Sequence, residues 1–268
     1  MFHDLFYPPA IAPLYTLARA TERVRLGPGA LNTQTLHPIE IARQTAALDL
    51  ASRGRAYLGL VTGAWLDRIG IDEKRPLTRL REVVEVVYRY LACDRSGFRG
   101  DYFILPPGAG PEFTPLRADV PLMIGTWSPG VSRFAATVAR EVKIGGSANP
   151  DMVTLMRSWL GPSDVGIVLG AVTVVDEDGD AARACAIAAS QMYTEVVGKL
   201  DRTLDLGPDD PIPPEKFMLA GTPEEVVAQT AVLLEAGAFR IEFGGPFGVD
   251  PEHGLDLLCE RVLPLLRE

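Results

Sequence analysis

Short apolar runs that are typical of buried strands alternate with amphipathic helical patterns along most of this chain. The expected strands are residues 24–26, 56–61, 121–125, 142–146, 165–175 and 239–243. The expected helices are residues 11–20, 37–52, 77–91, 131–140, 151–160, 181–199, 223–235 and 255–266. Asp151 and Thr222 are the expected N-caps of two of them, and His37 is expected to be a capping or loop residue. Because strands and helices alternate, the strands should run parallel and be joined by right-handed crossovers. The sequence therefore predicts an α/β protein built on a parallel sheet.

The order of the elements favours a TIM (β/α)8-type barrel over a doubly wound sheet. No break in composition divides the chain, so residues 1–268 are expected to form a single barrel domain. Within it, the Gly- and Pro-rich residues 97–117 are expected to be an excursion or a small hairpin. Only the six strands above and a strand end near Met1 are recognisable. The barrel is therefore expected to lack its first strand–helix unit.

The composition limits which classes of ligand and which cellular compartment are expected. The net charge is −9, whereas non-specific binding to nucleic acid or to an anionic membrane needs a basic surface. Small molecules are therefore the expected ligands. No apolar run reaches the roughly 20 residues that span a bilayer, and no signal peptide is recognisable. Cys93, Cys185 and Cys259 form no CxxC pair, so we expect buried thiols in a cytoplasmic protein.

The segment Gly27-Pro28-Gly29 interrupts the expected strand at residues 24–26. Proline removes a backbone donor and glycine permits unusual φ and ψ, so a regular ladder cannot simply continue there. An ordinary turn is the alternative to a bulge or kink. A polar run, residues 32–35, follows at the carboxyl end of the strand. Such strand ends hold the ligands of α/β enzymes, so we expect a ligand site here.

Two later strand ends are candidates for anion binding, because backbone N–H groups at strand–helix junctions can hold a phosphate. These are Gly125-Thr126-Trp127-Ser128 and Gly145-Gly146-Ser147. Tight turns without a ligand are the alternative. Neither segment matches a P-loop or a GxGxxG fingerprint, so nucleotide hydrolysis and a Rossmann NAD site are disfavoured. No metal-ligand spacing and no GxSxG elbow is present in the sequence.

Several segments together resemble the luciferase-like, flavin- or deazaflavin-dependent oxidoreductases, in particular their coenzyme F420-dependent branch, which includes methylenetetrahydromethanopterin reductase. Each segment is weakly specific, but they occur in family order over most of the chain. They are Gly27-Pro-Gly-Ala-Leu-Asn32, Thr35-Leu-His-Pro38, Leu48-Asp49, Ser52-Arg-Gly-Arg55, Leu58-Gly-Leu-Val-Thr-Gly-Ala-Trp65, Pro76, Arg79-Leu-Arg-Glu82, Pro121-Leu-Met-Ile-Gly125 and Gly221-Thr-Pro-Glu-Glu225.

The resemblance implies a TIM barrel that holds the tricyclic ring of coenzyme F420, or alternatively FMN, at the carboxyl ends of the strands. It also implies a non-proline cis peptide behind the ring, which would fall at Gly29-Ala30. Such a cofactor carries out the hydride chemistry, and the protein supplies position, electrostatics and exclusion of water. A homodimer formed through exposed barrel helices is common in this family and is expected here.

The resemblance and the chemistry of the side chains together suggest individual roles. Asn32 can donate its amide to the pyrimidine edge of the ring, and Thr62, next to Gly63, can offer a hydroxyl. Asp67 is a further candidate contact to the ring or the substrate. The alternatives are that Asn32 only stabilises a turn and that Asp67 is a solvated helix-start residue.

The sequence departs from the family at two places. His3 and Asp4 are the candidate catalytic residues at a strand end, but their order reverses the common Asp-His pair. Ala64 stands where the glucose-6-phosphate type has a catalytic glutamate, so that substrate is disfavoured. Four functions remain open: hydride transfer between F420 and a small organic substrate, FMN-dependent monooxygenation, a non-catalytic partner subunit with a truncated barrel, and an unrelated barrel enzyme such as one acting on a sugar phosphate.

Overall fold

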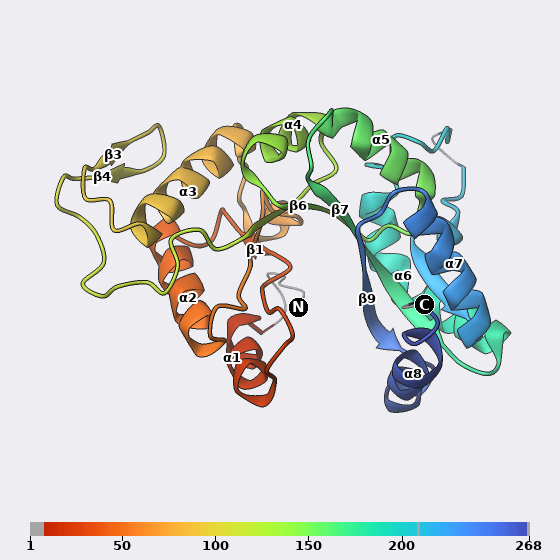
Figure 1. The fold of residues 1–268 in the computed structure, drawn as a ribbon. Coiled ribbons are helices and arrows are strands. Elements are labelled where there is room, and N and C mark those ends of the chain that lie inside the picture. Colours follow the sequence, from red (N-terminus) through yellow and green to blue (C-terminus); the bar gives the residue numbers. More distant parts are fainter. Residues whose placement is uncertain (1–7, 208–209, 267–268) are drawn as a thin grey trace. The chain divides into compact units, whose positions relative to one another are not determined.

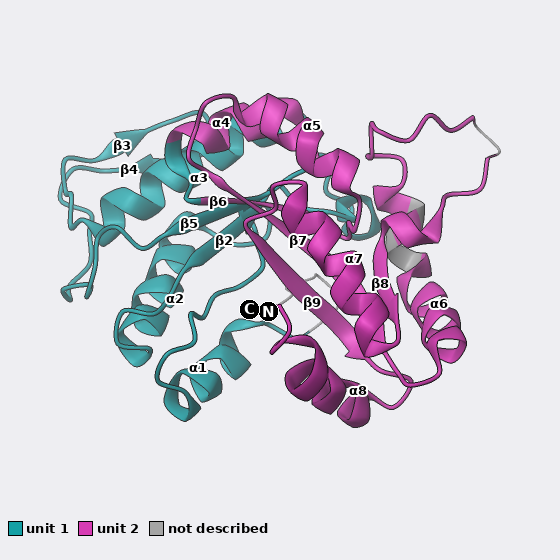
Figure 2. Cartoon of the chain, turned by 45° about the vertical axis from the view of Figure 1, so that its right-hand side comes forward, with its two compact units in different colours: residues 1–126, 138–140 teal, residues 127–137, 141–268 magenta. Residues whose placement is uncertain are grey.

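The computed structural model describes residues 8–207 and 210–266, which fall into two compact units (Figure 2). Unit 1 lies within residues 1–126 and 138–140, and unit 2 within residues 127–137 and 141–268. The candidate catalytic residues His3 and Asp4 lie outside the described residues.

Unit 1 is built on three parallel strands, β1 (Leu31–Asn32), β2 (Leu58–Val61) and β5 (Leu122–Gly125). Residue 31 pairs with residue 60, and residue 58 pairs with residue 122. The helices are α1 (Ile11–Ala20), α2 (Pro38–Ala51) and α3 (Pro76–Leu91), and α2 packs against both of the others (Figure 1). Because Leu80, Val83 and Val87 recur on one face of α3, they are fully buried.

The predicted excursion contains an antiparallel hairpin, β3 (Phe98–Arg99) and β4 (Ile104–Leu105), which lies beside α3 (Figure 1). The carboxylate of Glu82 in α3 accepts hydrogen bonds from the backbone N–H groups of Asp101, Tyr102 and Phe103, at 2.7, 2.9 and 3.1 Å. Glu82 itself is buried. The hairpin turn is therefore held to α3 by a charge-assisted contact.

A buried ion pair fixes the carboxyl-terminal end of the excursion, Arg117, to α2 in the same unit. The Asp49 side chain in α2 is 1% exposed, and both of its oxygens accept hydrogen bonds from the Arg117 guanidinium. Arg117 also donates to the backbone oxygen of Ala56 at 2.9 Å. Through these two contacts, Arg117 joins α2, the residues at the start of β2 and the segment before β5.

Unit 2 contains four parallel strands, and β7 (Gly166–Val175) pairs with each of the others, β6 (Glu141–Gly145), β8 (Met218–Gly221) and β9 (Arg240–Phe247). Its helices are α4 (Pro129–Val138), α5 (Pro150–Leu160), α6 (Gly179–Val197), α7 (Pro223–Glu235) and α8 (Pro251–Leu257). Short 3-10 helices span Leu66–Ile69 in unit 1 and Pro214–Lys216 in unit 2. The prediction of a parallel sheet with covering helices is confirmed within each unit.

Helix starts follow the predicted capping chemistry in two cases and depart from it in a third. Nδ1 of His37 accepts the backbone N–H of Ile39 before α2, and Thr222 and Glu225 form a reciprocal capping box at α7. Asp151 was the expected cap of α5, but Asn149 caps this helix and places Pro150 at its first position. The prediction for Asp151 is wrong because a side-chain acceptor in extended backbone directly before proline satisfies the free N–H groups first.

Three strand or helix predictions need correction. Residues 24–26 do not form a strand: only Leu26 pairs, with Ala56, and Val24 is exposed. The strand β8, which spans four residues after a proline-rich stretch, was not predicted from the sequence. The closing helix begins earlier than expected, at Pro251 after the cap Asp250, and becomes π-helical over Leu258–Val262. Among the described residues, no helix has the length and apolar character needed to cross a bilayer.

Candidate cofactor site

The chain between residues 27 and 30 leaves regular strand geometry, as predicted. The Gly29–Ala30 peptide bond is cis, at the position that the resemblance implied. The glycines here allow close backbone contact with β2. A Cβ on Gly27 would lie 2.4 Å from the Tyr57 carbonyl oxygen, and one on Gly59 would lie 2.1 Å from the Pro28 carbonyl oxygen. This segment leads directly into β1.

The strand register of unit 1 brings several predicted site residues to one edge of its sheet. Asn32 pairs with Val61, and Val61 pairs with Gly125. The residues that follow, Thr62 and Thr126, therefore leave adjacent strands at the same level. This edge is the carboxyl edge of the parallel strands, as the sequence predicted.

The two polar atoms of the Asn32 side chain have different surroundings. Its Oδ1 accepts the backbone N–H of Gln34 at 2.7 Å, which closes a turn, and this is the structural role that the sequence also allowed. Its Nδ2 donates no hydrogen bond to any described residue. Asn32 is nevertheless only 5% exposed. The amide N–H group is thus held in a defined direction without a protein acceptor within the described chain.

Gly63 packs closely against this amide and against the Leu66 side chain. Its φ is +110°, and a Cβ at this position would lie 2.9 Å from Asn32 Nδ2. The Thr62 carbonyl oxygen accepts Gln34 Nε2 at 3.2 Å, which ties the ends of β1 and β2 together. Asp67 lies in the first turn of the 3-10 helix and is exposed, so its proposed contact stays a prediction.

One further polar group at this edge, in the predicted polar run of residues 32–35, has no assigned role from the sequence. Thr33 is completely buried, and its Oγ1 has no hydrogen-bond partner among the described residues. Its backbone N–H, in contrast, donates to the Val61 carbonyl oxygen at 3.2 Å. A buried hydroxyl without a partner is uncommon, because leaving it unsatisfied typically costs about 1–3 kcal/mol. The carboxyl edge of unit 1 therefore holds two polar groups, the Asn32 amide and the Thr33 hydroxyl, that could bind a ligand.

Of the predicted anion-binding residues, those from Trp127 onward lie in unit 2, where Trp127 and Gly145 come together. The Trp127 indole N–H donates to the Gly145 carbonyl oxygen at 3.1 Å, and the Ser128 carbonyl oxygen accepts the hydroxyl and N–H of Ser132. The N–H groups of Gly146 and Ser147 both donate to the Gly170 carbonyl oxygen. Those two N–H groups are engaged within the protein, so an anion here would need other donors.

A buried polar cluster, which was not predicted from the sequence, holds the loop that follows β6. Asn149 is completely buried, and its Nδ2 donates to Asp201 at 2.9 Å and to Thr203 at 2.8 Å. Lys216 donates to Asn149 Oδ1 at 3.1 Å and to Asp151 at 3.0 Å. These partners lie more than fifty residues apart in sequence, so no local pattern indicates them.

Four charged side chains form a second unpredicted network across β6, β7 and β9. Lys143 pairs with Glu242, and Arg240 pairs with Glu242 at 2.6 Å and with Glu141 at 2.5 Å. A Cβ on Gly170 in β7 would lie 2.8 Å from the Lys143 side chain, so glycine lets this contact cross the strand. Burial raises the pKa of Glu242, but the charges of Lys143 and Arg240 outweigh burial and the net pKa is lowered. Glu242 is therefore ionised at neutral pH.

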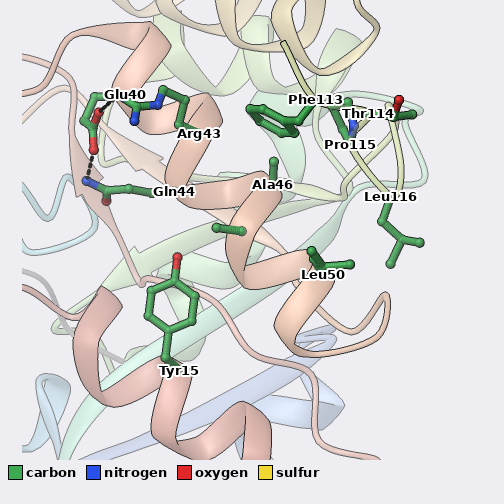
Figure 3. A pocket seen from close by; sticks show the side chains of 11 residues that line it. Tyr15, Glu40, Arg43, Gln44, Ala46, Leu50, Phe113, Thr114, Pro115 and Leu116 are labelled. Atoms are coloured by element: carbon green, nitrogen blue, oxygen red, sulfur yellow. Dashed lines mark hydrogen bonds and ion pairs between the residues drawn. The ribbon is translucent and has the colours of Figure 1, made fainter. Parts of the chain in front are cut away.

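A groove on the helical side of unit 1 is lined by side chains from α1, α2 and residues 113–116 (Figure 3). Its volume is about 460 Å³. Tyr15, Glu40, Arg43 and Gln44 supply polar groups, whereas Leu50, Phe113 and Leu116 supply exposed apolar surface. None of the predicted site residues lines this groove. Among the described residues, no cluster of His, Cys, Asp and Glu is arranged to hold a metal ion.

Comparison with known proteins identifies a family and close folds. The family model described as luciferase-like monooxygenase matches residues 2–240. The 5,10-methylenetetrahydromethanopterin reductase of Methanopyrus kandleri is 28% identical over 294 residues, which cover 92% of this chain and 84% of that protein. The F420-dependent glucose-6-phosphate dehydrogenase of Amycolatopsis mediterranei is 27% identical over 285 residues, which cover 97% and 84%.

A solved structure supports the same assignment. The coenzyme F420-dependent tetrahydromethanopterin reductase from Methanopyrus kandleri superposes with a TM-score of 0.81 at 25% identity, covering 98% of this chain and 89% of that one. The resemblance stated from the sequence is confirmed by these findings. The predicted α/β fold of the TIM-barrel type is confirmed as well.

Proposed function

Because this chain belongs to the luciferase-like monooxygenase family, we propose that it is an oxidoreductase that transfers hydride between the deazaflavin coenzyme F420 and a small organic substrate. The names of its relatives support this choice, since both the reductase and the dehydrogenase are F420-dependent enzymes. The structural observation that carries the proposal is the Asn32 amide. It offers a directed N–H donor, without a described protein acceptor, at the carboxyl edge of the strands.

The residues of unit 1 fit a planar ring with a hydrogen-bonding edge. Carbonyl groups on such an edge accept hydrogen bonds, and Asn32 Nδ2 and the Thr62 hydroxyl can donate them. Glycine at position 63 lets the backbone pass close to the Asn32 amide without displacing it, since a Cβ there would lie 2.9 Å from Nδ2. When bound, coenzyme F420 supplies the hydride donor and acceptor. The protein residues bind the ring, orient it and limit its access to water.

Within unit 2, Ser128, Gly145, Gly146 and Ser147 are the proposed phosphate-binding residues. The N–H groups of Gly146 and Ser147 are engaged with Gly170, so hydroxyl groups are the better donors here. Trp127 belongs to the same proposed group, whereas Gly125 and Thr126, at the end of β5, are proposed contacts within unit 1. Asp67, Gly29 and Ala30 remain proposed contacts in unit 1, and all these residues belong to a single proposed barrel domain over residues 1–268. Ala64 argues against glucose 6-phosphate as the substrate.

Binding of the cofactor tests this proposal. We expect calorimetric titration of the purified protein to show F420 binding at least about tenfold tighter than FMN binding, a difference of about 1.4 kcal/mol. Tighter binding of FMN would replace the proposal with an FMN-dependent monooxygenase. Binding of neither cofactor would contradict the oxidoreductase proposal and favour a non-catalytic partner subunit.

The proposal includes a cytoplasmic homodimer. The expectation of buried thiols is wrong for Cys93 and Cys259, which are exposed, and Cys185 is only partly buried. All three thiols are free, which supports a reducing compartment, and recovery of the native protein from outside the cytoplasm would contradict this location. The apolar end of the groove on α2, with Leu50 68% exposed, is the proposed dimer surface (Figure 3). Sedimentation velocity should show a dimer that Leu50→Glu dissociates, whereas Val232→Glu, at an exposed apolar residue of α7, should leave it intact. A monomeric native protein would contradict it.

A further inference from the structure

Arg79, in the first turns of α3, binds the loop that follows β1. Its Nε donates to the Thr33 carbonyl oxygen at 2.9 Å, and its Nη2 lies 3.4 Å from the Gln34 carbonyl oxygen. Thr33 and Gln34 directly follow Asn32. Because a guanidinium is a rigid planar fork, two such contacts fix both the position and the orientation of this short backbone segment.

The same guanidinium lies over two aromatic rings of the β3–β4 hairpin. Its carbon Cζ is 5.3 Å from the centre of the Tyr102 ring and 5.1 Å from that of Phe103. Both distances are within the range of cation–π attraction. No carboxylate of the described residues forms a contact ion pair with Arg79. Its position is therefore set by two backbone carbonyls on one side and by the aromatic rings on the other.

The hairpin that presents these rings is itself held in place. Glu82 binds three N–H groups of its turn, and the Tyr102 hydroxyl donates to Glu73 at 2.6 Å. Arg75 pairs with Asp101 at 2.8 Å. The Phe103 ring also contacts the His37 ring edge-on, with 5.4 Å between ring centres, just before α2. The hairpin is thus a fixed support for Arg79.

On the other side, the loop that Arg79 binds directs the Asn32 amide. The Gln34 N–H holds Asn32 Oδ1 at 2.7 Å, and the Gln34 side chain donates to the Thr62 carbonyl oxygen at 3.2 Å. A shift of Gln34 would rotate the Asn32 side chain, because the hydrogen bond to Oδ1 is what turns Nδ2 towards Gly63. Arg79 thus connects the hairpin to Asn32 through one residue.

We propose that Arg79 is a positioning residue that couples the β3–β4 hairpin to the Asn32 amide, so that the hairpin determines how tightly the cofactor ring is held. This inference rests on the proposed function for its effect on binding, but the coupling itself is a property of unit 1. The hairpin would then tune the site without contributing a side chain to the ring.

A double-mutant cycle tests the coupling. Arg79→Lys keeps the charge but loses the fork, and Phe103→Leu removes one ring while keeping an apolar side chain. Each substitution is expected to weaken F420 affinity about tenfold, within the usual range for coupled sites. If both act through the same contact, the double variant should be no weaker than about tenfold. Independent, multiplying effects, or no effect of Arg79→Lys, would overturn the proposal.

Hydrogen exchange separates this inference from the proposed function, because it needs no cofactor. In Arg79→Lys, the N–H groups of Thr33 and Gln34 should exchange at least about tenfold faster than in the native protein. The matched control is Arg89→Lys in the same helix, whose guanidinium pairs with Glu85 and Asp94, and it should change neither exchange at Thr33 and Gln34 nor affinity. If the native protein binds no F420, the proposed function fails, and the hydrogen-exchange result alone then tests the coupling. Unchanged exchange at both residues would then overturn the coupling.

Discussion

Replacing Arg117 with methionine is expected to lower the free energy of unfolding by about 3–5 kcal/mol. Arg117 supplies the counterion of Asp49, whose side chain is 1% exposed, and it also binds the carbonyl oxygen of Ala56. Methionine keeps the apolar stem but leaves the Asp49 carboxylate buried without its partner. Urea denaturation followed by circular dichroism measures the loss.

Two further variants show whether burial is the cause. Arg43→Met breaks an ion pair with Glu40 whose side chains are 60% and 42% exposed, so it should cost less than about 1 kcal/mol. Combining Asp49→Leu with Arg117→Met removes both charges and should recover part of the loss. A cost for Arg117→Met as small as that for Arg43→Met would show that the buried pair does not hold unit 1 together.

Replacing Gly63 with alanine is expected to weaken F420 binding by about ten- to a hundredfold. The new Cβ would lie 2.9 Å from Asn32 Nδ2 and 3.0 Å from the Leu66 side chain, so the amide or the loop must move. Losing one well-placed hydrogen bond costs about 1–3 kcal/mol, which corresponds to this range of affinity. Calorimetric titration of the variant measures the change.

Gly70→Ala is the matched control for this prediction. Gly70 also has a positive φ, +73°, but nothing lies within 4 Å of the Cβ that alanine would add. Both substitutions therefore introduce backbone strain of about 1 kcal/mol or more, and only Gly63→Ala crowds Asn32. Equal affinities in the two variants would contradict the position that we assign to the ring.

Local chemistry in the sequence predicted much of the fold. Helix starts with strong caps, such as Thr222 before Pro223 and His37 before Pro38, were found, because their donors and acceptors lie within a few residues. The strand β8 was missed because four residues carry too little periodicity to be recognised. The expected strand at residues 24–26 failed because Val24 faces solvent, which β propensity alone does not reveal.

The candidate site was predictable only where its signal is local. Gly27-Pro28-Gly29 predicted the irregular backbone. Asn32 was predicted as a site residue because it follows this segment at the end of a strand. In contrast, Arg79 acts on residues that lie more than forty positions earlier, and Lys143 pairs with Glu242 across 99 positions. Such contacts depend on tertiary packing, so the sequence alone gives no pattern for them.

A crystal structure of the complex with coenzyme F420 tests the central claim most directly. The account predicts that the edge of the ring accepts a hydrogen bond from Asn32 Nδ2, at about 2.7–3.2 Å, with Gly63 beside it. A ring bound elsewhere, for example in the groove between Tyr15 and Phe113, with Asn32 Nδ2 left without contact, would contradict it.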